Sequence, residues 1–220
     1  MAYQPQQWDL CLASDVTETY NTETSTSPDL VQMVVTAASR WFSSYCSRVF
    51  FAVANLTETR NGNDQNRMVF RQRPVWALSS VVINGTPILV VTDQISSGAL
   101  FDTDMVYLRG YQSGVALAGW VYGSLKFQRG IQNCSFTYSA GFQTPGQTAL
   151  GVTVAGAPLL PFDLTEGAAE TAGYWLKRHR NIANESTGQG PERVSFSKED
   201  VPPMVKTMLN TYRSATYRFA

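Results

Sequence analysis

The stretch at residues 27–51, SPDLVQMVVTAASRWFSSYCSRVFF, constrains the fold more than any other part of the sequence. Ser27 is a good N-cap, Pro28 suits the first helical position, and Asp29 places a negative charge where the helix dipole favours one. The apolar residues that follow recur at spacings of three and four, the pattern of one buried stripe on a helix. We therefore predict a long amphipathic helix around which a core can form.

The rest of the sequence changes its hydrophobic period twice. Residues 52–142 favour a period of two, with turn signals such as Asn-Gly between the runs, which predicts antiparallel strands. Two further helices are expected, one from about residue 160 to residue 180 with many Ala and Gly residues, and one starting at Pro202. We therefore predict an α+β fold, with helices packed together beside a small antiparallel β-sheet or barrel-like insertion.

We expect the whole chain to form a single domain over residues 1–220. Its helical part would cover residues 12–51 and 160–216, and its β part residues 52–142. An extended N-terminal arm is expected at residues 1–11. The polar stretch at residues 181–197 has almost no apolar residues, so we expect a mobile loop there, before the C-terminal helix.

Charge is balanced and sparse in this sequence. Lys and Arg together number 17, as do Asp and Glu, and charged residues make up only 15% of the chain. The balance gives no case for a nucleic-acid binder or a membrane-surface protein. The low charge fits a surface covered by neighbouring subunits, and it fits equally a surface rich in Ser, Thr, Asn and Gln. We expect neither a signal peptide nor a transmembrane helix.

No combination of residues indicates catalysis or a cofactor. The one histidine, His179, lies in a basic helix end without a marked nucleophile. Residues 110–114 do not match a nucleophile elbow, and the Gly-rich residues 188–191 lack the Lys-Ser/Thr of a phosphate loop. The three cysteines are scattered and suit a reduced core better than zinc. We therefore expect a non-enzyme with no cofactor and no metal.

Four motifs in a fixed order carry a resemblance to a known family. They are AASRWFSSYCSRVF at residues 37–50, a hairpin at 57–75 ending in Arg-Pro-Val, FTYSAGF leading to LPFDL at 136–164, and VPPMV followed by Leu-Asn-Thr-Tyr-Arg at 201–213. With these motifs the chain resembles the head–tail connector proteins (adaptor, or head-completion proteins) of tailed bacteriophages. It departs from compact family members in a longer β region at residues 84–129, an extended loop at residues 144–157 and the N-terminal arm.

The resemblance implies a structural virion protein at the head–tail interface, assembled in the host cytoplasm. Such adaptors form a homo-oligomeric ring, commonly a dodecamer, that docks under the portal protein and extends the DNA channel. The ring then provides the attachment surface for a downstream neck or tail protein. The implied partners are further copies of the chain, the portal, that downstream protein and genomic DNA in transit, with no membrane.

Aromatic and basic side chains in arms, loops and helix edges are the candidates for subunit or portal contacts, because such anchors are typical of interfaces. They are Trp8, Arg40, Ser44, Arg48, Lys177, Arg178, Arg180, Arg193, Arg213, Tyr217 and Arg218. A tail-side loop is expected around Tyr111, Gln112 and Trp120.

Two other interpretations stay open at this point. One is another neck protein, a stopper or a tail-completion protein, although these consist mainly of strands. The other is a non-viral, β-rich module that binds a ligand or carbohydrate, suggested by Trp120, Tyr122 and Phe127 in the β region.

Overall fold

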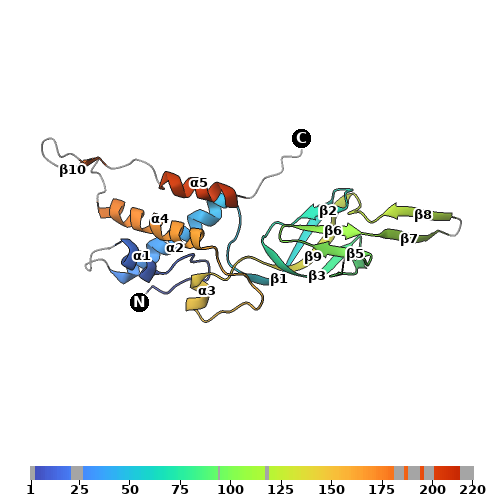
Figure 1. Ribbon diagram of the computed structural model, residues 1–220, viewed down its shortest axis with the longest axis horizontal. Helices are drawn as coiled ribbons and strands as arrows, with labels where there is room; N and C mark the ends of the chain where they lie inside the picture. The colour runs from blue at the N-terminus through green and yellow to red at the C-terminus, as the bar shows by residue number, and fades with distance from the viewer. Residues whose placement is uncertain are drawn as a thin grey trace. The chain divides into compact units, whose positions relative to one another are not determined.

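The structure is a computed structural model that describes residues 3–20, 27–93, 95–116, 119–180, 186–187, 194–195 and 201–213. The side chains of residues 111–116, 119–124, 179–180, 186–187 and 194–195 lie outside this description. The chain divides into two compact units (Figure 1). The helical unit comprises Met1–Phe51, Gln143–Thr153 and Leu159–Ala220, and the β unit comprises Ala52–Phe142 and Val154–Pro158.

The helical unit contains the five helices of the described residues, and the strands of the β unit are antiparallel, which confirms the α+β class. The helices are α1 (Ala13–Tyr20), α2 (Pro28–Cys46), α3 (Pro145–Ala149), α4 (Phe162–Arg180) and α5 (Pro203–Tyr212). Whether the two units act together as one adaptor domain stays a prediction.

Helix α2 is the expected amphipathic helix, but it is shorter than predicted. It ends at Cys46, because Ser47 adopts a left-handed conformation with φ 52° and its N–H bonds back to the carbonyls of Ser43 and Ser44. Ser27 is the N-cap residue, as expected, but its side chain makes no capping hydrogen bond. The buried face matches the predicted stripe and includes Val31, Val35, Ala38, Phe42 and Cys46.

Helix α4 uses its small residues to approach its neighbours closely. It contacts α2, α1 and α5. A Cβ atom on Gly167 would lie 2.8 Å from the Met208 methyl group of α5, and one on Gly173 would lie 2.9 Å from the Tyr20 ring of α1. The two glycines therefore fit the close approach of α5 and α1.

The β unit consists of two sheets and a hairpin. The four-stranded sheet has the order β1-β9-β3-β4 and the three-stranded sheet the order β2-β6-β5 (Figure 1). Both share one core, in which Phe70, Val106, Phe127, Phe136 and Tyr138 are buried. Among the described residues these sheets form no closed barrel. The strand bounds are β1 Val53–Gly62, β2 Arg67–Val69, β3 Val75–Ile83, β4 Thr86–Ile88, β5 Gly98–Phe101, β6 Met105–Arg109, β7 Tyr111–Ala116, β8 Gly119–Ser124 and β9 Gly130–Ala140.

Two stretches that the sequence suggested were loops contain regular structure. Strands β7 and β8 pair from Tyr111 opposite Ser124 to Ala116 opposite Gly119, so the expected loop tip is a β-hairpin. Helix α3 lies in the expected loop at residues 144–157, with Thr144 and Gln147 forming a capping box.

The expected mobile loop at residues 181–197 lies outside the described residues, except for two short strands. These are β10 (Ser186–Thr187) and β11 (Val194–Ser195), which pair with each other. Of the helices described, none combines the length and apolar character that crossing a membrane requires.

Candidate interaction surfaces

The N-terminal arm lies against the helical unit, where Leu10 and Cys11 are fully buried. The Leu10 N–H donates to the Ser39 hydroxyl of α2 at 3.0 Å. Trp8, a predicted interface residue, is half-buried, and the guanidinium carbon of Arg40 lies 4.7 Å from its ring centroid. The structure thus brings two predicted residues, Trp8 and Arg40, together in a cation–π contact.

Asp9, itself a residue of the arm, forms a buried polar centre with side chains of α2. Its Oδ2 accepts hydrogen bonds from the Gln32 amide at 2.7 Å, the Thr36 hydroxyl at 3.2 Å and the Gln6 N–H at 2.8 Å. Burial raises the pKa of the Asp9 carboxyl, while these hydrogen bonds and the charge of Arg40 oppose the rise. The arm is therefore fixed by a carboxylate that sequence analysis did not single out.

The C-terminal end of α2 is joined to α5 by aromatic and basic side chains. Arg48 donates to the Tyr212 carbonyl at 3.3 Å, and its guanidinium lies 5.1 Å from the Phe50 ring centroid. Arg213 lies 5.6 Å from the Tyr45 ring centroid. Two predicted residues, Arg48 and Arg213, thus contact their own unit, and their role in a subunit contact stays a prediction.

The other predicted contact residues fall into two groups. Ser44 on α2 is exposed, as are Lys177 and Arg178 on α4. The side chains of the remaining residues lie outside the description, although the backbone places Arg180 at the end of α4 and three residues in the β7–β8 hairpin. These remaining residues are Arg180, Arg193, Tyr217, Arg218, Tyr111, Gln112 and Trp120.

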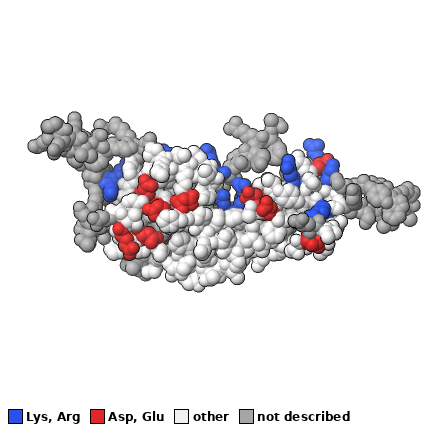
Figure 2. Space-filling view, viewed as in Figure 1, with Lys and Arg blue, Asp and Glu red and all other residues white. Residues whose placement is uncertain are grey.

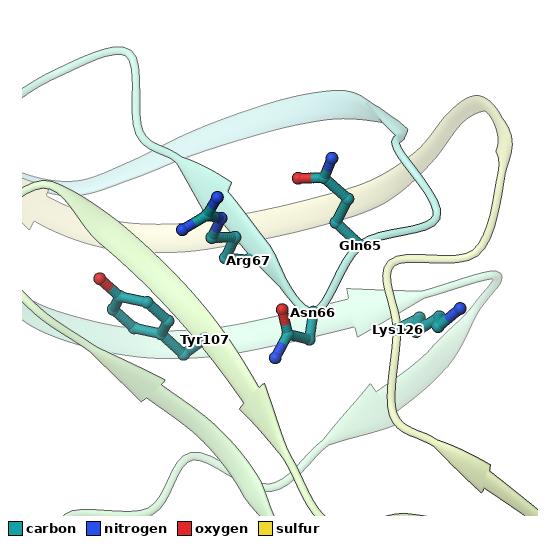
Figure 3. Close-up of a pocket in the computed structure, with 5 residues that line it drawn as sticks. All are labelled: Gln65, Asn66, Arg67, Tyr107 and Lys126. Carbon is teal, nitrogen blue, oxygen red and sulfur yellow. The ribbon is translucent and has the colours of Figure 1, made fainter.

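The β unit contains a polar cleft of about 430 Å³ that sequence analysis missed (Figure 3). Gln65, Asn66, Arg67, Tyr107 and Lys126 line it. Arg67 and Tyr107 are direct cross-strand partners on β2 and β6, and the Phe127 N–H next to Lys126 bonds the Gln65 carbonyl at 2.8 Å.

Arg67 and Tyr107 face outward because their neighbours along β2 and β6 face the core. Met68, Val106, Leu108 and Phe127 are all buried, and side chains alternate between the two faces of an extended strand. An alternation of polar and apolar residues was visible in the sequence. The meeting of residues 65–67, 107 and 126 was not, because it depends on the pairing of β2 with β6.

An acidic face covers part of the helical unit. Figure 2 shows Asp and Glu side chains gathered over α1 and α4. Glu166 accepts a hydrogen bond from the Tyr20 hydroxyl at 3.3 Å. Burial, together with Glu166 and Glu170, raises the pKa of Tyr20 to about 12. Asp15 of α1 completes this acidic face, since its charge and that of Glu166 both help to raise the pKa of the buried Cys11 thiol.

Metal ligands are not grouped in the described part of the chain. No set of three or more His, Cys, Asp or Glu side chains there could hold a metal ion. The three cysteines are buried and not bonded to one another, and burial raises the pKa of the Cys46 thiol to about 11.

Comparison with known proteins gave a family match and structural neighbours. The family model for "Head completion protein" matches residues 9–215. No curated protein matches the chain. A chain from the neck of an empty gene transfer agent (GTA) particle, computed with C6 symmetry, is 12% identical with a TM-score of 0.45. A chain from the virion of the native gene transfer agent particle is 13% identical with a TM-score of 0.44. In both cases the likeness covers 97% of this chain and 94% of the other.

The residues matched by the family model span both compact units and nearly the whole sequence. The chain belongs to the head completion protein family. This membership confirms the resemblance to head-completion proteins that the four sequence motifs carried. The interpretation as a non-viral ligand-binding module is not supported by it.

Proposed function

We propose that this protein is a head–tail adaptor that forms a ring under the portal. In this role it extends the DNA channel and provides the surface to which the next neck or tail protein attaches. The observation that carries the proposal is the family match over residues 9–215, which includes the helices, both sheets and the β7–β8 hairpin.

The surface of the helical unit supports an assembled state. It exposes large apolar side chains on several elements, and such residues are expected where another protein covers the surface. They are Met33, Leu150, Val152, Leu159, Phe162 and Met204, of which Phe162 is 77% and Met204 81% exposed. Charged residues form only 15% of the sequence, which also suits a protein that buries two different faces in a ring.

A balanced charge suits the channel role. The net formal charge of the chain is zero, so a ring of copies would have no large excess of cations for the DNA backbone. Strong DNA binding grows with the number of phosphates that a protein neutralises. DNA could therefore pass through such a ring without being held.

Size-exclusion chromatography with mass measurement tests this function, with the protein alone and mixed with its cognate portal. We expect a multimer of the 24.3 kDa chain that co-elutes with the portal. A protein that stays monomeric and never joins the portal would contradict the proposal. A monomer that adds only to an already formed portal–adaptor assembly would instead identify a stopper or tail-completion protein.

A further inference from the structure

The polar cleft of the β unit has the chemistry of a carboxylate-binding site. It presents the two cations Arg67 and Lys126, both exposed, together with the amides of Gln65 and Asn66 and the Tyr107 ring. No carboxylate in the described part of the chain forms an ion pair with Arg67 or Lys126. Guanidinium groups and amides donate hydrogen bonds well to carboxylates, and the guanidinium fork can bind one with two bonds.

The number of cations argues for a protein surface over DNA. A protein that binds the phosphate backbone of duplex DNA typically contacts about six to ten phosphates. Two cations in one cleft suit one or two carboxylates instead. The backbone of the cleft is also held by hydrogen bonds, from Phe127 to Gln65 at 2.8 Å and from Leu108 to Asn66 at 2.7 Å, so its main chain is fixed before a ligand arrives.

The acidic face of the helical unit is the complementary surface within the same chain. Its members are Asp15, Glu166 and Glu170, and Glu166 and Glu170 are one helical turn apart. No Lys or Arg among the described residues forms an ion pair with any of the three. The sequence of the β unit has seven Lys and Arg against five Asp and Glu, whereas that of the helical unit has ten against twelve.

We propose that the cleft of one copy receives the acidic face of a second copy. The two surfaces differ, so the contact is heterologous, and repetition of such a contact closes a ring when the rotation permits it. Complementary charge would contribute specificity and a faster association rate rather than most of the affinity. This inference rests on the proposed ring and adds to it the two surfaces that meet between neighbours.

Charge-reversal variants test the contact between the cleft and the acidic face directly. The double variant Arg67→Glu/Lys126→Glu reverses the cleft, and Glu166→Lys/Glu170→Lys reverses the acidic face. We expect each alone to raise the protein concentration needed for assembly at least about tenfold, because like charges then oppose each other. An equimolar mixture of the two variants should assemble again, since every contact in an alternating ring joins opposite charges. Arg129→Glu, an exposed cation outside the cleft, is the matched control and should assemble as the wild type does.

A photo-cross-linking experiment tests the contact between the cleft and the acidic face separately from the formation of the ring. Tyr107 is replaced by p-benzoylphenylalanine, and isotopically labelled and unlabelled copies are mixed with and without duplex DNA. We expect cross-links between copies, from the cleft to peptides of α1 or α4, and circular dichroism should show that all variants fold. If the wild type forms rings but the cross-links reach another segment, the same copy or DNA, the cleft assignment is wrong while the ring stands. Cross-links to α1 or α4 of another copy without any ring would support the contact and contradict the ring.

Discussion

Asp9 makes the stability of the docked arm depend on pH. Because burial raises the pKa of its carboxyl above 3.8, the folded protein binds the proton more tightly than the unfolded chain does. Its contribution to stability is therefore fully present at low pH. That contribution is lost as the pH rises through the raised pKa, where a charge must be buried.

The variant Asp9→Asn should remove this pH dependence. An Asn oxygen can still accept from Gln6, Gln32 and Thr36, but the side chain has no proton to lose. We expect the free energy of unfolding of the wild type to fall relative to that of Asp9→Asn as the pH rises from about 4 to 7. Urea unfolding at several pH values measures the difference. Parallel curves for the two proteins would show that the pKa of Asp9 is not raised.

Tyr138 holds the buried polar centre of the β unit. It is fully buried, its hydroxyl donates to the Glu58 carboxylate, and the Gln72 N–H donates to the hydroxyl oxygen at 3.3 Å. The variant Tyr138→Phe removes both of these buried hydrogen bonds, so we expect a loss of about 1–3 kcal/mol in the free energy of unfolding. Tyr107→Phe, whose hydroxyl lies outside the core, should change that free energy by less than about 0.5 kcal/mol. Equal losses in urea unfolding would contradict the special role of Tyr138.

Residue types were easier to predict than residue pairings. The sequence indicated Trp8 and Arg40 as separate surface candidates, and the structure joins them 4.7 Å apart. It also pairs Arg67 with Tyr107, which are 40 positions apart in the chain. Such contacts depend on strand register and on the path of the arm, neither of which a local pattern contains.

At the scale of elements, hydrophobic period predicted α2, α4 and α5 and missed the five-residue α3. Helices α2 and α4 have enough turns for their apolar stripes to be recognised. Helix α3 has only five residues, too few for a period, and its signal was the Thr144 capping box alone. The β7–β8 hairpin was missed because its sequence is rich in Gly and small residues, which are also typical of loops.

Helix α3 has a further role, since it forms one wall of the arm's docking site. The Gly146 N–H donates to the Asp9 carbonyl at 3.1 Å, and a Cβ on Gly146 would lie 2.0 Å from the Gln6 carbonyl oxygen. Because that oxygen belongs to the backbone, the arm must move to admit any side chain.

The variant Gly146→Val should therefore release the arm. We expect faster hydrogen exchange at the amides of Asp9 and Leu10, and a loss of at least about 1 kcal/mol in the free energy of unfolding from overpacking. Ala149→Val, at an exposed position of the same helix, is the control and should leave exchange in the arm unchanged. Unchanged exchange in Gly146→Val would mean that the arm does not depend on α3.

At the scale of the whole molecule, the order of helix, strands and helices was enough to predict the fold class, and four ordered motifs were enough to predict the family. The division into two units follows from that order, because the chain leaves the helical unit at residue 51 and returns at residue 143. The cleft and the acidic face could not be predicted in the same way. Each depends on how separate segments of one unit come together, and the proposed contact further requires a second copy.

The central claim is that copies of this chain form a ring on the portal. Cryo-electron microscopy of the protein bound to its cognate portal measures this most directly. We expect one closed ring, coaxial with the portal, in which every copy contributes both units and the central channel stays open. Portal particles without added density, or with single copies scattered on their outer surface, would contradict it.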